Sequence, residues 1–457
     1  MNARAKKVAI FLLVCGMTFF AARACGNIMV AAFADAGRAT SGASGFARAR
    51  VGLSSVALSI PLLQDRTEYF FGATAARRTM TVVFWTCAVL VAYAYIGYPI
   101  VVWLMSRWRP RPWHRQETQP SVSLIMAVHN GGALLQEKIE HLLTHDYPEA
   151  LVEVLIVSDG STDETDVILE GIRHPRLRTW RLPEHRGKSA ALNQAILEAR
   201  HEILVFIDIR PRLETGALAR LVTNFADPSV GAVAGELHLR SGDHDAGSGA
   251  VSGLYWRYEQ WVRKSESAID SVVGVYGGFY GVRRSLAVTM PEGLILDDML
   301  QPLAVVRQGY RSVLDAGAHV WDTWPKTAHG EFRRKVRTLA GNFQLVRIAP
   351  WLLGRTNRVR LQFVSHKLLR LIVPAFLVFA LASSLALSHW QLYRWLTLAQ
   401  LGFYLLGVLG MRAQARVLRK IAGPVAAICL LNAAAIAGFW HFLVKGDDLR
   451  KIWLPSE

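Results

Sequence analysis

Cysteine is scarce in this sequence, and acidic residues are outnumbered by basic ones. The 457 residues include four cysteines, and none of them lies between positions 106 and 367. That region therefore cannot form a disulfide framework or a thiolate metal site, which agrees with a domain that faces the cytosol. The four are Cys15, Cys25, Cys87 and Cys429.

Charged residues are absent from four long stretches, at 80–105, 371–388, 395–411 and 421–440. A helix that crosses the apolar core of a bilayer needs about 20 predominantly apolar residues. We therefore expect transmembrane helices at 80–105, 371–388, 395–411 and 421–444. The third is short for a span, so a re-entrant or interfacial segment is an alternative there.

Basic residues gather beside these apolar stretches. The formal net charge is +17, from 52 Lys and Arg against 35 Asp and Glu. Positive charge beside spans is the positive-inside signal and attracts anionic lipids, so this placement favours a membrane over nucleic acid. We expect an integral inner-membrane or plasma-membrane protein that contacts membrane lipids and no nucleic acid, with 106–367 on the cytoplasmic side. The flanking residues are Arg107, Arg109, Arg111 and Arg115 after the first stretch, and Arg412, Arg416, Arg419 and Lys420 before the last.

The N-terminal part, 1–79, starts with basic residues and an apolar run at 8–22. This pattern is typical of a signal peptide, or alternatively of a first membrane segment. The Gly- and Ala-rich extension behind it has no pattern of a packed core. A basic linker at 106–120 then leads from the span at 80–105 to a domain at 121–345. The remaining parts are a basic interfacial segment at 346–370, the C-terminal membrane helices within 371–444 and a tail at 445–457.

Short apolar runs alternate with helical patterns in the domain 121–345. Runs of about five residues rich in Val, Ile and Leu are typical of buried strands in parallel sheets. The resulting β-α-β-α-β-α-β order predicts an α/β fold with a doubly wound, mostly parallel sheet. Ligands bind at the carboxyl ends of such strands, where Asp159 and Asp208 follow two of the runs. The apolar runs lie at 153–157 and 203–207, and further short strands are expected at 122–128 and 178–182.

Five motifs occur in order in this domain: V-S-D-G-S, R-G-K-S, D-I-R, L-D-D and R-K-V-R. Because of these motifs and their order, the chain from about 121 to 345 resembles the family 2 glycosyltransferases. It resembles in particular the membrane-embedded synthases of cellulose, hyaluronan and poly-N-acetylglucosamine. The resemblance implies a GT-A type nucleotide-sugar-binding domain flanked by transmembrane helices. It also implies an inverting transfer of a hexosyl or N-acetylhexosaminyl group from a nucleotide-diphosphate sugar, with UDP as the expected nucleotide.

The resemblance assigns five residues to the nucleotide-sugar donor. Asp159 matches the position that binds uridine, with the loop at His129 and Asn130 nearby, and Lys188 and Arg334 are expected beside the nucleotide. From the residues alone, Asp159 also fits a strand-to-helix turn. Lys188 at a helix start fits an anion site, or a solvated surface lysine.

Asp208 begins the motif that in the family is D-x-D and holds a metal ion. A hard cation such as Mg²⁺ or Mn²⁺ needs oxygen ligands and neutralises a departing diphosphate. This sequence has Arg210 at the second acidic position. We therefore expect Asp208 to hold the metal with the diphosphate and waters, and the alternative is a direct contact of Arg210 with the phosphates.

The resemblance places the catalytic groups near the end of the domain. Asp298 is the expected base, because an attacking hydroxyl must lose a proton, and Asp297 is its helper. Arg337 is the expected contact of the leaving diphosphate, in a motif where Arg334 and Thr338 replace the family's Gln and Trp. The alternatives are a helix cap for the aspartates and a basic helix on the membrane surface for the arginines.

Gly277, Gly278 and Tyr280, in Y-G-G-F-Y-G, are candidates for the acceptor side. Glycines permit close approach and aromatic rings suit sugar faces, although such residues also serve as core or membrane-interface anchors. The acceptor is a polysaccharide or a lipid-linked hydroxyl, with cell-envelope or export subunits as further partners. A catalytically silent membrane subunit of a polysaccharide assembly complex is the alternative function, supported by Arg210.

Overall fold

The computed structural model describes the secondary structure of residues 61–240, 248–323, 328–412 and 416–445. The predictions for the run at 8–22 and for the C-terminal tail lie outside these residues. The chain divides into two compact units, which are described separately. The units are Met1–Ala92 with Ala375–Phe403, and Tyr93–Pro374 with Tyr404–Glu457.

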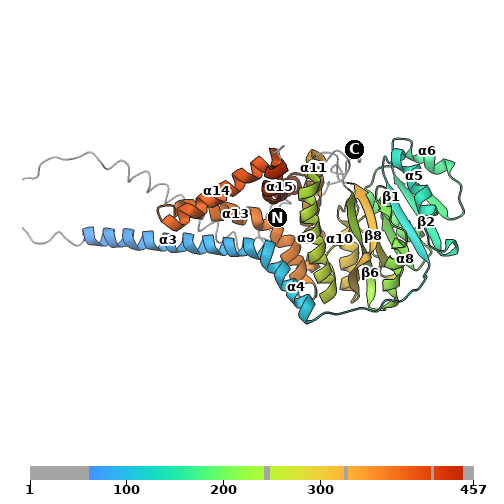
Figure 1. The fold of residues 1–457 in the computed structure, drawn as a ribbon, viewed down its shortest axis with the longest axis horizontal. Coiled ribbons are helices and arrows are strands. Elements are labelled where there is room, and N and C mark those ends of the chain that lie inside the picture. Colours follow the sequence, from blue (N-terminus) through green and yellow to red (C-terminus); the bar gives the residue numbers. More distant parts are fainter. Residues whose placement is uncertain (1–60, 241–247, 324–327, 413–415, 446–457) are drawn as a thin grey trace, which may run out of the picture. The chain divides into compact units, whose positions relative to one another are not determined.

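The larger unit contains an eight-stranded sheet with the strand order β3-β2-β1-β4-β7-β6-β8-β5 (Figure 1). Its first four strands pair in parallel, as the sequence predicts. The strands are β1 (Val122–Val128), β2 (Val152–Asp159), β3 (Leu177–Leu182), β4 (Ile203–Ile207), β5 (Arg212–Leu213), β6 (Val230–Arg240), β7 (Phe279–Arg283) and β8 (Arg311–Thr323).

The other half of the sheet is mixed. β7 runs antiparallel to both β4 and β6, and β5 runs antiparallel to β8, while β6 and β8 are parallel. The expectation of a mostly parallel sheet therefore holds for the half that begins the domain, and the complete sheet is mixed. The reason is β7, which forms from part of the glycine-rich segment that the sequence analysis treats as an acceptor loop.

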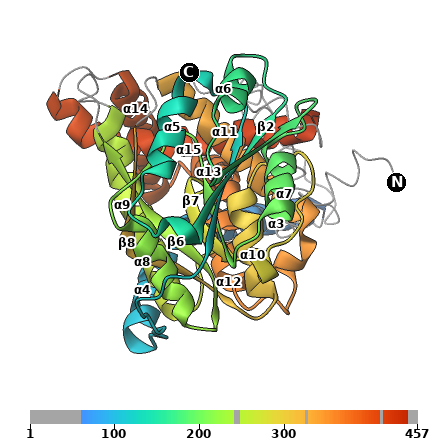
Figure 2. The same ribbon diagram turned by 90° about the vertical axis from the view of Figure 1, so that its right-hand side faces the viewer.

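Helices cover both faces of this sheet because its strands are apolar on both sides. Side chains of β1 at alternate positions pack with α5 (Gly132–Leu143) and α8 (Ala217–Thr223) in one core cluster. α7 (Lys188–Glu198) packs on β1 and β2, and α10 (Asp297–Arg307) lies on the same side as α7 (Figure 2). The short helix α6 (Thr165–Gly171) follows β2 and packs against α5.

Two further helices of the larger unit, α9 (Ser248–Ile269) and α11 (Ala328–Ile348), line the candidate site, and each packs on another helix. α9 packs on α4 (Tyr98–Trp108), which continues the π-helical turn Tyr93–Gly97. α11 packs along α15 (Arg416–Lys445). The sequence predicts α11 as a basic helix, whereas its long contact with α15 arises only in the folded chain.

Four helices among the described residues are long and apolar enough to cross a membrane. Each overlaps one of the stretches that the sequence analysis predicts as a span. They are Thr74–Trp108, Arg360–Ala386, Gln391–Arg412 and Ile421–Val444. The second begins in α12 (Arg360–Gln362), passes through a π-helical turn at Phe363–Leu368 and continues as α13 (Leu369–Ala386).

The smaller unit holds most of α3 (Pro61–Ala92) together with parts of α13 and of α14 (Gln391–Arg412). Phe84 of α3 meets the Tyr393 ring edge to face at 5.5 Å between centroids. Arg77 lies over the Trp390 ring at 3.8 Å, a cation–π contact at the end of the apolar stretch.

Gly160, directly after β2, is a sensitive point of the larger unit. Its φ is +60°, and a Cβ there would overlap the backbone of Glu184 and His185. We expect Gly160→Ala to lower the free energy of unfolding by about 1–3 kcal/mol. Thermal unfolding of the detergent-solubilised protein measures this. Gly171→Ala is the matched control, because no heavy atom lies within 4 Å of a Cβ at Gly171; equal effects of the two changes would contradict the argument.

Candidate active site

A pocket of about 370 Å³ lies beside the carboxyl end of β4 and the first turn of α10. Loops before α7 and after β4 contribute to its wall, together with α9, α11 and the segment that opens the Arg360–Ala386 helix. It brings together the majority of the residues predicted from the sequence. These are Lys188, Asp208, Gly277, Asp297, Asp298, Arg334 and Arg337, whereas His129, Asn130, Asp159, Gly278 and Tyr280 are not among its lining residues.

Lys188 connects two carboxylates of this pocket. Its Nζ lies 2.9 Å from Asp208 Oδ1 and 3.3 Å from Asp297 Oδ2. Lys188 begins α7 directly after Gly187, whose φ of 94° suits glycine. Burial alone lowers the pKa of the Lys188 ammonium, but Asp208 and Asp297 more than offset this and raise the pKa above its ordinary value. The ammonium therefore remains charged and holds the two acidic groups together.

Asp159 is fully buried, and its carboxylate accepts hydrogen bonds from the loop before α7. Oδ1 accepts from the backbone N–H of Arg186 at 2.8 Å, and Oδ2 accepts from Gly187 at 2.9 Å. His185 Nδ1 lies 2.9 Å from Oδ2. Asp159 thus shapes the loop that presents Lys188, and its direct contact with a nucleotide remains a prediction.

His129 and Asn130 connect the loops that follow β1 and β2. His129 Nδ1 lies 2.8 Å from the backbone oxygen of Asp159. Asn130 adopts a positive φ of 51°, and its Oδ1 accepts a hydrogen bond from the Thr162 N–H at 2.8 Å. Both residues lie at the strand ends where the sequence places them, and their contact with a donor also remains a prediction.

Asp297 and Asp298 form the first turn of α10. The cap position is Leu296, and neither aspartate caps the helix, so the alternative of a helix cap is wrong. Asp298 Oδ1 is buried and has no hydrogen-bond partner in the described part of the chain. Burial, with the neighbouring charge of Asp297, raises the pKa of Asp298 to about 7. Asp298 therefore titrates near neutral pH, as a general base should.

Arg334 and Arg337 extend from α11 to the pocket wall. Burial lowers the pKa of the Arg337 guanidinium, against the opposing effect of Asp208 and both α10 aspartates. Arg337 Nε is buried and lacks a hydrogen-bond partner among the described residues. A desolvated guanidinium with a spare donor is suited to an anionic ligand.

Arg210 and Asp208 lie in different surroundings although they share one motif. Asp208 has a side chain that is 40% exposed. Arg210 Nη2 lies 3.5 Å from Asp322 Oδ2, and the Tyr276 hydroxyl donates to the same oxygen at 3.0 Å. Asp322 thereby balances the charge of Arg210. Arg210 therefore does not neutralise Asp208, although both belong to the D-I-R motif.

The segment Y-G-G-F-Y-G corrects one prediction. Tyr280 is fully buried on β7, where its ring stacks on Phe206 at 4.4 Å between centroids, so it cannot touch an acceptor. Tyr276 lines the pocket instead. A Cβ on Gly277 would lie 3.1 Å from Asp298 Oδ2, so glycine keeps the space beside that carboxylate open. Gly278 packs next to the Tyr276 ring.

Residues 123–287 match the sequence model described as Glycosyl transferase family 2. The chain carries a family 2 glycosyltransferase domain. The match runs from β1 to β7 and ends before Asp297, so the α10 and α11 residues of the pocket lie outside it. The prediction of a glycosyltransferase is thereby confirmed at the level of this domain.

Two curated relatives are poly-beta-1,6-N-acetyl-D-glucosamine synthases. The one from Staphylococcus epidermidis is 23% identical over 272 residues, which is 58% of this chain and 65% of that protein. The one from Staphylococcus aureus strain COL is 24% identical over 230 residues, 49% of this chain and 55% of that protein. The chain thus spans between 55% and 65% of the length of these relatives.

A solved structure shares the fold of the glycosyltransferase domain. It is a mannosyltransferase from Pyrobaculum calidifontis in complex with GDP-Man and Mn²⁺, with a TM-score of 0.58 and 24% sequence identity. The similarity covers 78% of this chain and 98% of that one. It supports the predicted GT-A fold.

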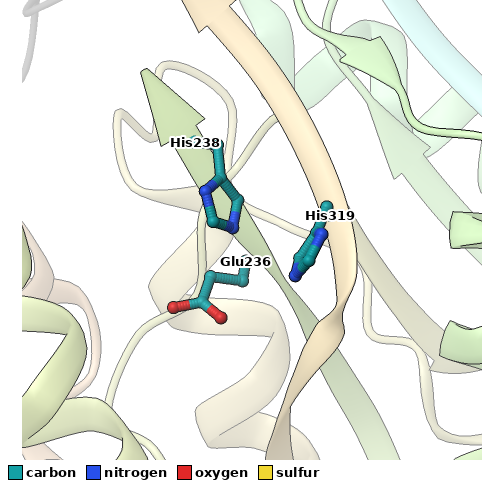
Figure 3. Close-up of side chains that lie close together, drawn as sticks. All are labelled: Glu236, His238 and His319. Carbon is teal, nitrogen blue, oxygen red and sulfur yellow. The ribbon is translucent and has the colours of Figure 1, made fainter. Parts of the chain in front are cut away.

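A second group of metal-ligating residue types lies in the glycosyltransferase domain, away from the pocket lining. Glu236, His238 and His319 place one ligand atom each within 4.8 Å of one another (Figure 3). Two of these residues already have protein partners. Lys264 Nζ lies 2.7 Å from Glu236 Oε1, and the ring nitrogens of His319 contact a Glu214 oxygen and a backbone oxygen at 2.7 and 2.8 Å. We therefore interpret the group as a hydrogen-bonded cluster.

Sequence reasoning misses the buried Lys138 and several residues that line the pocket. Lys138 is buried, donates to the backbone oxygen of Pro211, and has a pKa lowered by burial to about 7. Its only signal is a lysine on the apolar face of a helical pattern. The missed pocket residues are Glu259, Arg263, His366, Lys367 and Arg370. Glu259 and Arg263 lie in an amphipathic helical pattern, and the other three precede the apolar stretch 371–388, where basic residues indicate a membrane flank.

Lys188→Gln tests the contacts that hold the pocket together. Without the ammonium, Asp208 and Asp297 repel each other, and protonation at low pH relieves this repulsion. We therefore expect the variant to lose at least about 1 kcal/mol of stability at pH 8 and clearly less at pH 5.5, measured by thermal unfolding in detergent. Arg186→Gln removes a cation two positions earlier that pairs with the exposed Glu292, and little change is expected. A pH-independent loss for Lys188→Gln would contradict the electrostatic role.

Proposed function

We propose that this protein is an integral-membrane inverting glycosyltransferase. It transfers a sugar from a nucleotide-diphosphate sugar, with UDP as the expected nucleotide, to a hydroxyl of a polysaccharide or a lipid-linked acceptor. One observation carries this proposal. A single pocket holds Asp298, a carboxyl group with a pKa of about 7, together with the cations Lys188 and Arg337. The family 2 domain supports the same reaction class.

In the proposed reaction, the acceptor hydroxyl loses its proton to the carboxylate of Asp298. The acceptor oxygen forms the new bond to the anomeric carbon of the sugar while the bond from that carbon to the diphosphate oxygen breaks. The electron pair of the broken bond stays on the diphosphate, whose charge Arg337 and Lys188 stabilise. Asp297 keeps the pKa of Asp298 raised, so the base is strong enough to accept the proton near neutral pH.

Asp208 is the proposed ligand of a Mg²⁺ or Mn²⁺ ion. Its carboxylate is exposed toward the pocket, and Mg²⁺ is commonly held by one or two carboxylates with substrate phosphates and waters. The residues present fit this arrangement, with Asp208 as the single protein carboxylate of the motif. When bound, the ion adds positive charge to the leaving diphosphate. The mannosyltransferase of similar fold that was solved with Mn²⁺ supports the proposal.

The four long apolar helices support insertion in an inner or plasma membrane. We propose that the glycosyltransferase domain faces the cytoplasm, because arginines follow the first span closely. The relatives named as poly-beta-1,6-N-acetyl-D-glucosamine synthases support a polysaccharide product, whereas Thr338 at the place of the family's tryptophan favours a different acceptor geometry.

The test is sugar transfer by membranes that contain the full chain. UDP-glucose, UDP-N-acetylglucosamine, UDP-galactose and GDP-mannose are supplied separately, and nucleotide release and product length are measured. Release with one donor and a product that contains its sugar are the expected results. Nucleotide binding without turnover for every donor would overturn the proposal in favour of a silent subunit.

Asp298→Asn removes the proposed base. We expect transfer to fall by a factor of about 10² to 10⁴ while the nucleotide still binds, since the side chain keeps its shape. In the unaltered protein, activity should rise with pH through about 7, because only the deprotonated carboxylate accepts a proton. Kinetic pH profiles measure both effects.

Asp297→Asn is the matched neighbour of this variant. It removes a negative charge that raises the pKa of Asp298, so the rising limb of the pH profile should move to lower pH. Full activity of Asp298→Asn would exclude Asp298 as the base. An unchanged position of the rising limb of the pH profile in Asp297→Asn would exclude it as well.

Metal dependence tests the role of Asp208. Chelation by EDTA should stop transfer, and Asp208→Asn should raise the Mn²⁺ or Mg²⁺ concentration for half-maximal activity by about tenfold or more. Glu236→Gln alters the other candidate cluster and should leave this concentration unchanged. The reverse pattern in the two variants would move the metal site to Glu236, His238 and His319.

A further inference from the structure

The pocket continues past the catalytic carboxylates into a second charged region. We name this region the basic annexe and define it as Arg263, His366, Lys367 and Arg370, all of which line the pocket. Arg263 comes from α9, and the other three come from the helix Arg360–Ala386, which is one of the candidate membrane spans. The proposed reaction assigns no role to any of these residues.

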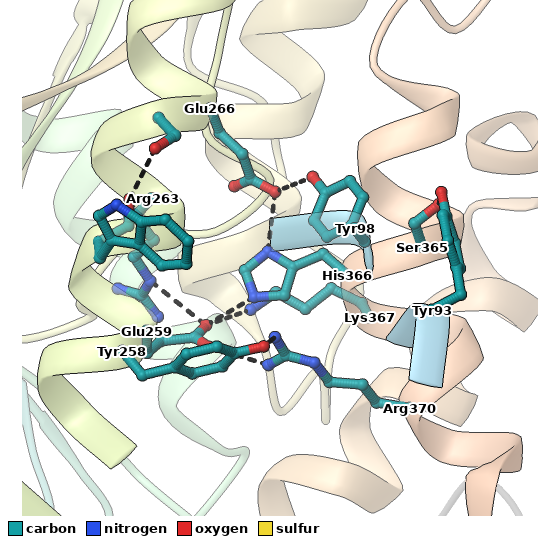
Figure 4. A network of polar contacts seen from close by, with 12 residues as sticks. Tyr93, Tyr98, Tyr258, Glu259, Arg263, Glu266, Ser365, His366, Lys367 and Arg370 are labelled. Atoms are coloured by element: carbon teal, nitrogen blue, oxygen red, sulfur yellow. Dashed lines mark hydrogen bonds and ion pairs between the residues drawn. The ribbon is translucent and has the colours of Figure 1, made fainter. Parts of the chain in front are cut away.

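Glu259 is the carboxylate at the centre of the annexe (Figure 4). Lys367 Nζ lies 2.9 Å and His366 Nε2 lies 3.0 Å from its Oε1, and Arg370 Nη1 lies 3.0 Å from its Oε2. Arg263 Nε is farther away, at 3.6 Å. Burial alone raises the pKa of Glu259, but the surrounding His366, Lys367 and Arg370 hold it well below its ordinary value. Glu259 therefore remains ionised.

Positive charge exceeds negative charge in the annexe. Arg263, Lys367 and Arg370 are three basic side chains that converge on the single carboxylate of Glu259. The next carboxylate, Glu266, contacts other groups through Oε1, while its Oε2 is buried without a hydrogen-bond partner among the described residues. His366 Nδ1 lies 2.8 Å from its Oε1, and the Tyr98 hydroxyl donates to the same oxygen at 2.5 Å.

Two cations of the annexe keep donors for a ligand. Lys367 donates one hydrogen bond within the described residues, to Glu259, and an ammonium group has three donors. Arg263 Nε is buried and makes no hydrogen bond in the part of the chain that the structure covers. Buried cations with unused donors are costly unless an anion completes them.

The surroundings of the annexe are apolar on one side. Leu237, Leu239, Trp256 and Leu339 line the same pocket. Lys367 lies in the π-helical turn Phe363–Leu368, directly before the apolar α13. Such turns occur frequently at functional sites. A ligand that combines an anionic group with an apolar portion matches this wall.

We propose that the basic annexe binds a phosphate ester group of the acceptor and thereby positions the acceptor hydroxyl at Asp298. This inference rests on the proposed glycosyl transfer and narrows its acceptor class. The phosphate has two possible sources, a lipid phosphate in the membrane or a soluble sugar phosphate, which share the chemistry that Arg263 and Lys367 recognise. Asp298 and Arg263 line the same pocket, and in this proposal one acceptor molecule contacts both.

Binding to the full detergent-solubilised protein tests the proposal, with dissociation constants measured by microscale thermophoresis. The probes are farnesyl phosphate, farnesol, glucose 1-phosphate and UDP. We expect farnesyl phosphate to bind at least about tenfold more tightly than farnesol. Lys367→Gln and Arg263→Gln should each weaken the binding of farnesyl phosphate by about tenfold. UDP binding should stay intact in both variants, and this also shows that they are folded.

Two further variants separate this site from the donor site. Arg337→Gln should weaken the binding of UDP and leave the binding of farnesyl phosphate unchanged. Arg257→Gln, on an exposed position of the same helix as Arg263, should change neither. Equal binding of glucose 1-phosphate and farnesyl phosphate would identify a soluble sugar phosphate as the source of the acceptor phosphate. A clear preference for farnesyl phosphate would identify a lipid phosphate as that source.

Three results would overturn the inference. These are equal binding of farnesol and farnesyl phosphate, unchanged farnesyl phosphate binding in Lys367→Gln and Arg263→Gln, and loss of UDP together with farnesyl phosphate in those variants. Failure of the proposed function gives a different pattern. In that case UDP does not bind or no donor is turned over, while the unaltered protein still distinguishes farnesyl phosphate from farnesol.

Discussion

The contact of one ammonium group with two carboxylates is the constraint on which the pocket depends. Lys188, Asp208 and Asp297 come from the start of α7, the end of β4 and the start of α10. Asp297 is almost fully buried beside a second aspartate, which is unfavourable without a cation. Because Lys188 supplies that cation, α10 can begin at the end of β4, and Asp298 is then held in the pocket wall. Asp159 contributes indirectly, since it accepts hydrogen bonds from the loop that presents Lys188.

Several polar groups in the pocket lack hydrogen-bond partners, and they include both acceptors and donors. Asp298 Oδ1 lacks a donor, and Arg337 Nε and Arg263 Nε lack acceptors, within the described part of the chain. Native proteins satisfy most buried polar atoms, so three such exceptions in the lining of one pocket indicate a site that a ligand completes. The low dielectric that makes these groups costly also strengthens their interaction with a charged ligand.

The sequence predicts the parallel half of the sheet and most of the charged pocket residues. β1, β2 and β4 are short apolar runs followed by polar residues, and Lys188, Asp208 and Asp298 occur in recognisable motifs. It does not predict β7, because a segment rich in glycine has little strand propensity of its own and becomes a strand through its neighbours β4 and β6. For the same reason Tyr280 is assigned to an acceptor although it lies in the core. The sequence also does not show whether Asp159 points to a ligand or to nearby N–H groups, since both are typical of a strand end. Three of the annexe residues, His366, Lys367 and Arg370, lie more than 100 residues after Arg263 in the sequence, and only tertiary structure brings the four together.

The ion pairs of Glu259 have a consequence for how the protein can be divided. They join α9 of the glycosyltransferase domain to the first turns of an apolar helix more than 100 residues later, at intervals of 108 and 111 residues for Lys367 and Arg370. A shortened chain that ended at 345 would remove every cation but Arg263 from this carboxylate and would open one side of the pocket to water. The glycosyltransferase domain is therefore not a self-contained module, because the start of the apolar helix Arg360–Ala386 supplies part of the pocket wall.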